Sequence, residues 1–407
     1  TDEWGGTFEG RMKFGMEVLK AVREEVGPDF VVGMRITGDE FHPDGLNHEE
    51  MKKIAQYYDA TNMVDYFGVV GSGCDTHNTL ANVIPNMSYP PEPFLYLAAG
   101  IKEVVNVPVI HAQNIKDPNQ AKRILEAGYV DFVGMTRAHI ADPHFIAKIK
   151  MNQVDQIRQC VGANYCIDRQ YQGLDVLCIQ NAATSREYMG LPHIIEKTTG
   201  PVRKVLVIGG GPAGLEAARV AAERGHSVTL IEKANELGGQ LVLAAKAPQR
   251  DQIAGITRWL VMEVERLGVE VRLECAADKA LVDELAPDVC ILATGGRPFI
   301  DQHTEWGAEE GLVVSTWDIL SGKVEAGKNV LVYDTICEFS GMSAADYLAS
   351  KGALVELVTD DIKPGIGIGG TTFPTYYRSL YEKEVVMTSD FLLEKVYREG
   401  DTLVAVL

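Results

Sequence analysis

The sequence predicts an α/β protein that combines the C-terminal half of a (β/α)8, or TIM, barrel with a cysteine-rich loop and two Rossmann-like dinucleotide-binding units. Three observations predict this fold. Apolar and helical stretches alternate over residues 1–150, a Gly-x-Gly-x-x-Gly motif follows an apolar run, and three spaced cysteines stand between these two parts. We expect four parts, bounded at 1–150, 151–200, 201–325 and 326–407.

The first part has the pattern of a βα repeat. Helical patterns at 47–60, 92–105 and 117–127 separate four apolar runs that fit buried parallel strands. These runs are FVVGMRI (30–36), VDYFGVV (64–70), VPVIHA (107–112) and VDFVGMT (130–136). A barrel of this type needs eight such units in roughly 250 residues. We therefore expect a fragment that lacks the first half of the barrel; a half-barrel that dimerises is the alternative.

Composition excludes several classes of protein. The 407 residues are 46% hydrophobic and 23% charged, as in ordinary globular proteins. A net charge of −19 opposes binding to nucleic acid or to anionic membranes. We see no signal peptide and no apolar run near the ~20 residues of a membrane span. An odd set of seven cysteines favours a reducing, cytoplasmic setting, and we expect Cys275 and Cys290 to be reduced core residues.

The strongest motif is Gly209-x-Gly211-x-x-Gly214, which follows the strand-like run KVLVI and opens a helical pattern. The first glycine makes the turn, the second admits a pyrophosphate and the third lets helix and strand pack closely. Glu232 ends the next strand, where it can accept hydrogen bonds from a ribose. Further candidates lie in ELGGQ (236–240) and ILATGGRP (291–298): Gly239, Gln240, Thr294 and Gly295. A glycine-rich turn without a ligand is the alternative.

A second copy of this unit begins near residue 328. Alignment of VLVY (330–333) with VLVI (205–208) puts Asp334, Ile336 and Phe339 at the three glycine positions. Bulky side chains there block the approach of a pyrophosphate, and the carboxylate repels it. We therefore predict a degenerate site that does not readily exchange electrons with NAD(P)H. The chain stops within an apparent strand, so we expect a truncated C-terminus.

The three spaced cysteines are Cys160, Cys166 and Cys178. Their spacing fits an iron–sulfur cradle of the form C-x2-C-x2-C-x11-C, except that Ala163 stands at the second ligand position. Thiolates hold such clusters, usually four to a cluster. The sequence therefore leaves three possibilities: a three-iron cluster, a four-iron cluster with an outside ligand, or three structural cysteines without a cluster.

The chain resembles the trimethylamine dehydrogenase family of flavoproteins, which includes histamine dehydrogenase and 2,4-dienoyl-CoA reductase. The resemblance covers essentially the whole chain. It depends on DEWGGTFEGRMKF (2–14), RAHIADP (137–143), CIQNA (178–182), GGGPAGLEAA (209–218) and ILATGGRP (291–298). Within the family, the cysteine loop and the degenerate second unit look most like the dimethylglycine demethylase branch, whose large subunits act on N-methylated amino acids.

The resemblance implies an FMN site at the C-terminal face of the barrel. Arg35 matches the arginine at the flavin N1–C2=O edge, and Thr136 and Arg137 match the phosphate site. Gln113 and Asn114 stand where the family usually has a Gly-Arg pair, which is a departure from the pattern. Ordinary salt-bridge roles for the two arginines are the alternative.

The resemblance also places the reacting groups in the loop GSGCDTHNTL (71–80). Asp75 falls where dienoyl-CoA reductases keep a histidine and near an acidic residue of the amine dehydrogenases. A carboxylate there suits an ammonium substrate, as charge partner or base. His77 is the second candidate, and a structural loop is the alternative. The family's tyrosine and histidine after strand four would precede residue 1.

From this resemblance we expect an oligomeric enzyme that demethylates a small N-methylated amine or amino acid oxidatively. It would use FMN, a second nucleotide that is either FAD or ADP, and a 3Fe-4S or 4Fe-4S cluster. Its electrons would pass to an electron-transfer flavoprotein or an Fe–S partner subunit. An NAD(P)H-dependent enoate or dienoyl-CoA reductase and a non-catalytic electron-transfer subunit are the alternatives.

Overall fold

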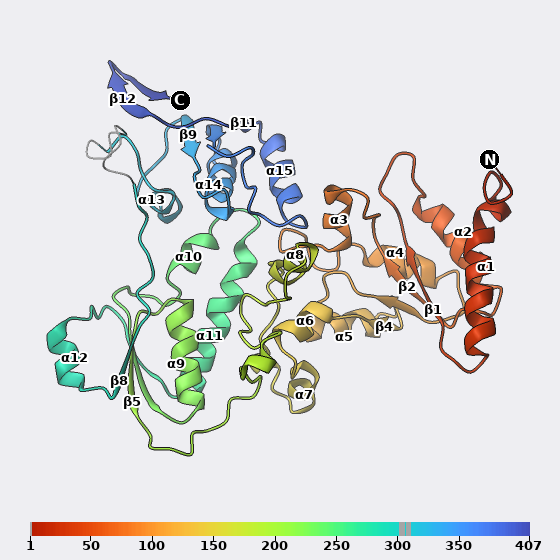
Figure 1. Cartoon of the computed structure of the whole chain (residues 1–407), viewed down its shortest axis with the longest axis horizontal. Helices are drawn as coiled ribbons and strands as arrows, with labels where there is room; N and C mark the ends of the chain where they lie inside the picture. The colour runs from red at the N-terminus through yellow and green to blue at the C-terminus, as the bar shows by residue number, and fades with distance from the viewer. Residues whose placement is uncertain (1, 301–305, 307–310) are drawn as a thin grey trace. The chain divides into compact units, whose positions relative to one another are not determined.

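The computed structural model describes residues 2–300, 306 and 311–407. The chain forms two compact units, 1–140 and 141–407 (Figure 1). Unit 1 contains α1 (Phe8–Val26), β1 (Gly33–Thr37), α2 (His48–Asp59), β2 (Tyr66–Val70), α3 (His77–Val83), α4 (Leu95–Lys102), β3 (Val109–His111), α5 (Pro118–Glu126) and β4 (Phe132–Val133). Helix α6 (Thr136–Ala141) ends at the border with unit 2.

Unit 1 is built on one parallel sheet with the sequential strand order β1-β2-β3-β4. Apolar side chains of the strands and of the intervening helices form its core, and several are fully buried: Phe67, Leu97, Ile101, Val109 and Ile124. Sequential parallel order with helical crossovers is the arrangement of a (β/α)8 barrel segment. The predicted βα repeat is therefore confirmed.

The helices of unit 1 begin where the sequence provides a cap. Helix α2 starts at a capping box in which the Asn47 side chain and Glu50 satisfy each other's backbone N–H groups. Helix α5 starts at Asp117 with Pro118 at its first position. The three helices expected at 47–60, 92–105 and 117–127 correspond to α2, α4 and α5. Helix α3 was not predicted; it is a short helix capped by Thr76.

Unit 2 begins with α7 (Phe145–Lys150) and continues through the cysteine loop, residues 151–200. The loop contains η1 (Val154–Gln156), α8 (Tyr165–Tyr171) and η2 (Glu187–Met189). What we call the first lobe follows, with β5 (Lys204–Ile208), α9 (Pro212–Glu223), β6 (Ser227–Ile231), α10 (Gln240–Ala244), η3 (Asp251–Ile253), α11 (Ala254–Arg266), β7 (Glu270–Arg272), α12 (Lys279–Leu285) and β8 (Val289–Leu292).

The remaining elements begin with α13 (Thr316–Ser321). What we call the second lobe comprises β9 (Asn329–Tyr333), α14 (Phe339–Ser350), β10 (Leu354–Val358), α15 (Phe373–Glu382) and β11 (Val386–Thr388). The chain closes with an antiparallel hairpin of β12 (Lys395–Glu399) and β13 (Thr402–Val406).

Each lobe has its own parallel sheet. The strand order is β7-β6-β5-β8 in the first lobe and β11-β10-β9 in the second. Both lobes repeat strand, turn, helix and strand, so β5 and β9 are equivalent, as the sequence alignment predicted. In the second lobe, Met342 and Leu348 of α14 pack with Leu357 of β10 and Tyr376 of α15. This packing fixes α15 against the sheet.

None of the seven cysteines is in a disulfide. The expectation that Cys275 and Cys290 are core residues is wrong for Cys290, which is exposed, whereas Cys275 is half-buried against the first lobe's core. The reason is the position of β8. It is the edge strand of its sheet, and Leu292 on it is 74% exposed.

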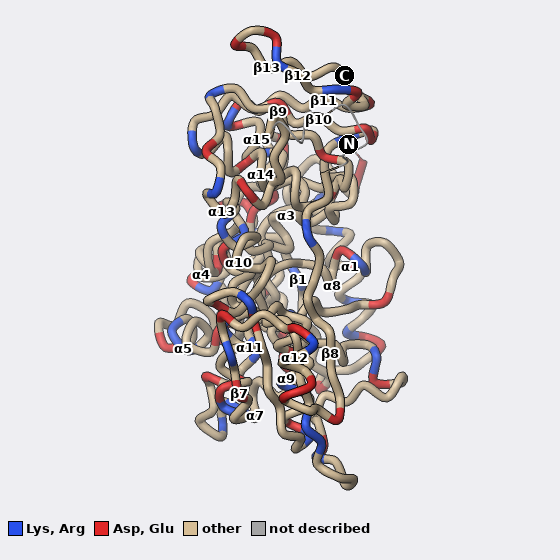
Figure 2. The backbone as a smooth tube through the Cα atoms, turned by 90° about the vertical axis from the view of Figure 1, so that its left-hand side faces the viewer, with Lys and Arg blue, Asp and Glu red and all other residues tan. Residues whose placement is uncertain are grey.

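Within the described residues, no helix has both the length and the apolar character that crossing a membrane requires. Figure 2 shows acidic and basic residues interspersed along the chain, without one dominant basic stretch.

Candidate functional site

The Gly-rich turn between β5 and α9 has the geometry of a phosphate-binding loop. Gly209 has φ +111°, and a Cβ there would lie 2.3 Å from the carbonyl oxygen of Ala293. A Cβ on Gly214 would lie 1.8 Å from the carbonyl oxygen of Gly209. Around Gly211 the nearest atom to such a Cβ is the Cα of Gly239, at 4.0 Å. Two glycines therefore permit close packing, and the middle one leaves room for a ligand.

The other predicted residues of this site converge on the turn. Glu232 accepts hydrogen bonds from the backbone N–H groups of Gly210 at 2.6 Å and Ala234 at 2.9 Å. The Nε2 of Gln240 lies 3.5 Å from where a Gly295 Cβ would be. Thr294 follows the residue that contacts Gly209. Glycines, carboxylate and amide thus surround the start of α9, where a helix N-terminus favours a phosphate. These residues fit a dinucleotide.

In the second lobe the corresponding turn is filled by its own carboxylate. Asp334, which is 3% exposed, follows β9 directly. Its Oδ1 accepts hydrogen bonds from the backbone N–H groups of Ile336 at 3.2 Å and Cys337 at 3.1 Å. A Cβ on Gly341 would lie 2.3 Å from Asp334 Cγ, so α14 packs tightly against this side chain. The N–H groups that could bind a phosphate are already satisfied.

The side chain at the third glycine position is also packed in place. The centroids of the Phe339 and Tyr376 rings lie 6.1 Å apart. The guanidinium of Arg250 lies 4.1 Å from the centroid of the Phe339 ring. Arg250 comes from the first lobe, so Phe339 contributes to the contact between the lobes. Ile336, by contrast, is 67% exposed. The turn between β9 and α14 therefore contributes side chains to the packing of the second lobe.

At the carboxyl ends of the unit 1 strands, buried side chains tie the loops together. Gln113, after β3, accepts from the N–H of Gly71 at 2.6 Å and donates Nε2 to the carbonyl oxygens of Asn82 and Val83 at 2.9 and 3.0 Å. Arg137, after β4, donates to the carbonyl oxygen of Pro85 at 2.7 Å. The predicted phosphate-site residues therefore also fix the segment that follows β2.

The predicted reacting residues lie on the same edge of the sheet. Asp75 is exposed, and its Oδ1 accepts a hydrogen bond from the hydroxyl of Thr79 at 3.0 Å. His77 is the exposed first residue of α3. Arg35 is exposed on the edge strand β1, and Thr136 is exposed at the start of α6. Each is available to a ligand, although no direct contact joins Asp75 to Arg35 among the described contacts.

Within the part of the chain that the structure describes, three buried polar atoms at these strand ends have no hydrogen-bond partner: Ser72 Oγ, Asn114 Oδ1 and His111 Nε2. Ser72 and Asn114 both have positive φ values, which turn the loops after β2 and β3. Unpaired polar atoms in a protein interior are uncommon and call for a partner such as a ligand or water. Ser72 and Asn114 therefore fit a polar cofactor at this edge. Sequence reasoning missed Ser72, since a single serine carries no distinctive pattern.

His111 is fully buried, and its Nδ1 donates to the carbonyl oxygen of Val69 at 3.1 Å. Burial lowers the pKa of His111 to about 4. The ring is thus neutral at physiological pH. In register it pairs with Val69, whose side chain packs beside Leu97 of α4, so both belong to the layer between sheet and helices.

In the cysteine loop, Cys160 and Cys178 are close enough to interact electrostatically. The backbone N–H groups of Gln180 and Asn181 donate to the Cys178 sulfur. The backbone N–H of Gly162 donates to the Cys160 sulfur at 3.4 Å. A cavity of about 350 Å³ adjoins Cys178 and is also lined by Tyr165, Leu177, Ile179, Asn181, Ala182 and Arg186. Such N–H donors and adjacent space fit thiolate ligands of a cluster.

Cys166 lies in the first turn of α8. Within the described residues, no three His, Cys, Asp or Glu side chains are arranged to hold a single metal ion. A cluster separates its ligands by its own width, so this finding concerns a mononuclear site. Burial raises the pKa of Cys178. The N–H groups of Gln180 and Asn181 and the charge of Arg158 lower it, each by less than burial raises it.

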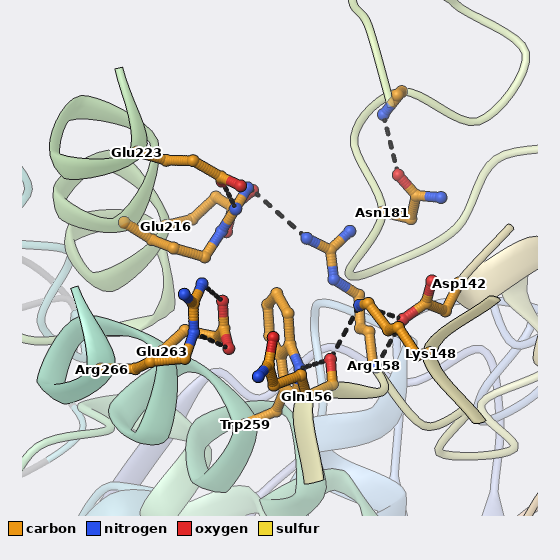
Figure 3. A network of polar contacts seen from close by, with 12 residues as sticks. Asp142, Lys148, Gln156, Arg158, Asn181, Glu216, Glu223, Trp259, Glu263 and Arg266 are labelled. Carbon is orange, nitrogen blue, oxygen red and sulfur yellow. Dashed lines mark hydrogen bonds and ion pairs between the residues drawn. The ribbon is translucent and has the colours of Figure 1, made fainter. Parts of the chain in front are cut away.

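Arg158 is a largely buried cation within this loop (Figure 3). Its guanidinium lies 4.2 Å from the Trp259 ring centroid and 3.9 Å from Glu216 Oε1. Its Nε has no hydrogen-bond partner among the described residues. Glu216 is already bound by Arg219 at 2.7 Å. Burial lowers the pKa of Arg158. A loosely paired buried cation beside Cys178 favours an anionic group there.

The sequence is similar to that of known flavoproteins. Residues 1–156 match the NADH:flavin oxidoreductase / NADH oxidase family, and residues 204–287 match the FAD dependent oxidoreductases. The whole chain is 76% identical to an N,N-dimethylglycine/sarcosine dehydrogenase of Chromohalobacter salexigens. The predicted resemblance is confirmed.

Two further proteins resemble this chain. A probable N-methylproline demethylase of Rhizobium meliloti is 41% identical over 99% of the chain. The chain covers 59% of the length of each of these two relatives. Histamine dehydrogenase from Rhizobium sp. 4-9 shares the fold over 100% of this chain and 61% of that one, with a TM-score of 0.88 and 24% identity. Flavoprotein folds of FMN type and FAD type are thus both present.

Proposed function

We propose that this protein oxidatively demethylates a small N-methylated amine or amino acid such as dimethylglycine. The observation that carries the proposal is the position of Asp334, whose carboxylate takes the N–H groups that a second nucleotide would need. Without that nucleotide, electrons enter from an organic substrate. The similarity to relatives described as a dimethylglycine/sarcosine dehydrogenase and an N-methylproline demethylase supports this substrate class.

The roles of individual residues follow from their chemistry. Asp75 would pair with the ammonium group of the substrate or accept its proton, and His77 is the second candidate for that role. Arg35 would face the N1–C2=O edge of FMN, and Thr136 and Arg137 would hold its phosphate. Gln113 would contribute to the cofactor site by fixing the neighbouring loop through its bonds to Gly71, Asn82 and Val83. Bound FMN supplies a hydride acceptor. Hydride loss from an N-methyl carbon leaves an iminium in the substrate, which water converts into formaldehyde and the demethylated amine.

Electrons would then leave through the cysteine loop. Cys160, Cys166 and Cys178 would hold a three-iron cluster, or a four-iron cluster with one outside ligand beside Ala163. The first lobe would bind FAD or ADP through Gly209, Gly211, Gly214, Glu232, Gly239, Gln240, Thr294 and Gly295. The acceptor would be an electron-transfer flavoprotein or an Fe–S partner subunit, and the enzyme would be an oligomer.

Product analysis tests this function. Full-length protein is incubated without oxygen with dimethylglycine and an artificial electron acceptor, and formaldehyde and sarcosine are quantified. We expect the two products in equal amounts. Absence of turnover with dimethylglycine, sarcosine and N-methylproline, combined with reduction of an enoyl thioester by NADH, would replace the proposal by the reductase alternative.

A further inference from the structure

The cysteine loop and the second lobe are joined by a buried polar contact about 200 residues apart in sequence. Asp168, on α8, is 8% exposed. Its Oδ1 accepts hydrogen bonds from the backbone N–H of Thr371 at 2.9 Å and from the Thr371 hydroxyl at 2.8 Å. Its Oδ2 accepts from the hydroxyl of Thr372 at 3.3 Å. One carboxylate thus receives three hydrogen bonds from the turn before α15.

A second side chain of the loop binds the same turn. Asn164, the residue before α8, is 2% exposed and donates Nδ2 to the Thr371 hydroxyl at 3.0 Å. Its left-handed φ of +57° starts the helix. Asn164 and Asp168 therefore hold both ends of the first turn of α8, which contains Cys166.

The turn in the second lobe is shaped for this contact. Thr372 precedes α15 and makes no side-chain capping bond to that helix; its hydroxyl donates to Asp168 instead. Asp168 thus supplies negative charge at a helix start from another segment. A Cβ on Gly369 would lie 2.1 Å from Asp168 Cγ and 2.3 Å from Oδ2. A larger residue at 369 would displace the carboxylate.

We propose that the second lobe is a clamp for the cysteine loop, and that Asp168 is a positioning residue that fixes α8 and thereby Cys166. This gives a role to a lobe whose phosphate cradle is closed by Asp334. Only the effect of the clamp on an iron–sulfur cluster rests on the proposed function. Its effect on α8 itself does not depend on that proposal.

The test compares variants of the full-length protein. Thr371→Val removes the hydroxyl that bonds Asp168 and Asn164 while keeping the side-chain shape, and Thr371→Ser restores the hydroxyl. Gly369→Ala forces a steric conflict with Asp168. Gly327→Ala is the matched control, because a Cβ at Gly327 meets no atom within 4 Å.

Two readouts are measured. We expect hydrogen exchange in α8 to rise roughly tenfold in Thr371→Val and Gly369→Ala, which corresponds to a local loss of about 1.4 kcal/mol. Exchange in β5 and α9 reports whether the first lobe stays folded. Iron and sulfide per flavin should fall in the same variants, and Thr371→Ser and Gly327→Ala should match the wild type in both readouts.

The two readouts separate the proposals. If the wild-type protein contains no iron, the cluster is excluded. If hydrogen exchange in α8 still rises only in Thr371→Val and Gly369→Ala, the clamp is supported. Unchanged exchange in α8 of Thr371→Val and Gly369→Ala would overturn the clamp, whatever the iron content. If Gly369→Ala does not fold, Thr371→Val against Thr371→Ser still decides.

Discussion

The backbone N–H of Cys337 donates to Asp334 Oδ1 across 3.1 Å, so a carboxylate occupies the position that a phosphate oxygen takes in a working dinucleotide turn. The equivalent turn in the first lobe has glycine at this position and open space beside Gly211. The same local fold therefore serves a ligand in one lobe and internal packing in the other.

Replacing Asp334 by alanine should destabilise the second lobe. The substitution leaves the buried N–H of Cys337 without its acceptor, and an unsatisfied buried group costs about 1–3 kcal/mol. The N–H of Ile336 is only part-buried and can reach water. We expect a loss of roughly 1–3 kcal/mol in local stability, measured by hydrogen exchange in β9 and β10. Asp334→Asn keeps an acceptor oxygen and should lose less. An equal loss in both variants would show that charge, and not the two N–H bonds, is what matters.

His111 should make unit 1 less stable at acid pH. Its pKa is about 4 in the folded protein and about 6.5 when exposed. As pH falls from 6.5 towards 4, the unfolded chain binds a proton that the folded chain does not, so the free energy of unfolding falls. The full effect is on the order of 3 kcal/mol.

His111→Asn tests this dependence, because the Asn amide can still donate to the carbonyl oxygen of Val69 but does not titrate. Urea unfolding between pH 7 and 4.5 should show a smaller decrease in the variant than in the wild type. His42→Asn, at an exposed position, is the control and should keep the wild-type dependence. Parallel pH profiles for wild type and His111→Asn would contradict a buried neutral ring.

Asp75→Asn should slow reduction of the flavin by substrate without unfolding the loop. An amide oxygen can still accept the Thr79 hydroxyl, but the negative charge is lost. Positioned acid–base groups commonly contribute ~10²–10⁴-fold. Stopped-flow absorbance measures the rate, with the exposed Asp44→Asn as control. A wild-type rate in Asp75→Asn would return this loop to a structural role and direct attention to His77.

Ala163→Cys should change the metal content of the cysteine loop. Ala163 stands where a fourth thiolate would complete the ligand set, and an iron without a thiolate is lost readily. Low-temperature electron paramagnetic resonance of oxidised protein should show a three-iron signal in the wild type and a shift towards a four-iron centre in the variant. Finding neither iron nor acid-labile sulfide in anaerobically prepared protein would leave the three cysteines as structural residues.

Local patterns predicted the parts of the structure that depend on neighbours in sequence. The βα repeat and the glycine turn at 209–214 each follow from a few adjacent residues, so their signals are visible in the sequence. Filling of the second turn was predicted in outline from Asp334, Ile336 and Phe339. The hydrogen bonds that make Asp334 part of the packing required the structure.

Contacts between distant segments had no such signal. Asp168 and Thr371 are ordinary residues in their own segments, and only the fold makes them partners. Arg158 precedes Cys160 by two residues, but its stacking on Trp259 depends on how α11 packs against the loop. The exposure of Cys290 likewise follows from the edge position of β8, which an apolar run cannot reveal.

The most direct test of the account compares electron sources in one experiment. Oxidised full-length protein is mixed anaerobically in a stopped-flow instrument with dimethylglycine, NADH or NADPH, and flavin absorbance is followed. The account predicts rapid bleaching by dimethylglycine and slow, incomplete bleaching by either nucleotide, because Asp334 closes the second phosphate cradle. Rapid bleaching by NADH or NADPH at micromolar concentration, with none by dimethylglycine, would contradict it.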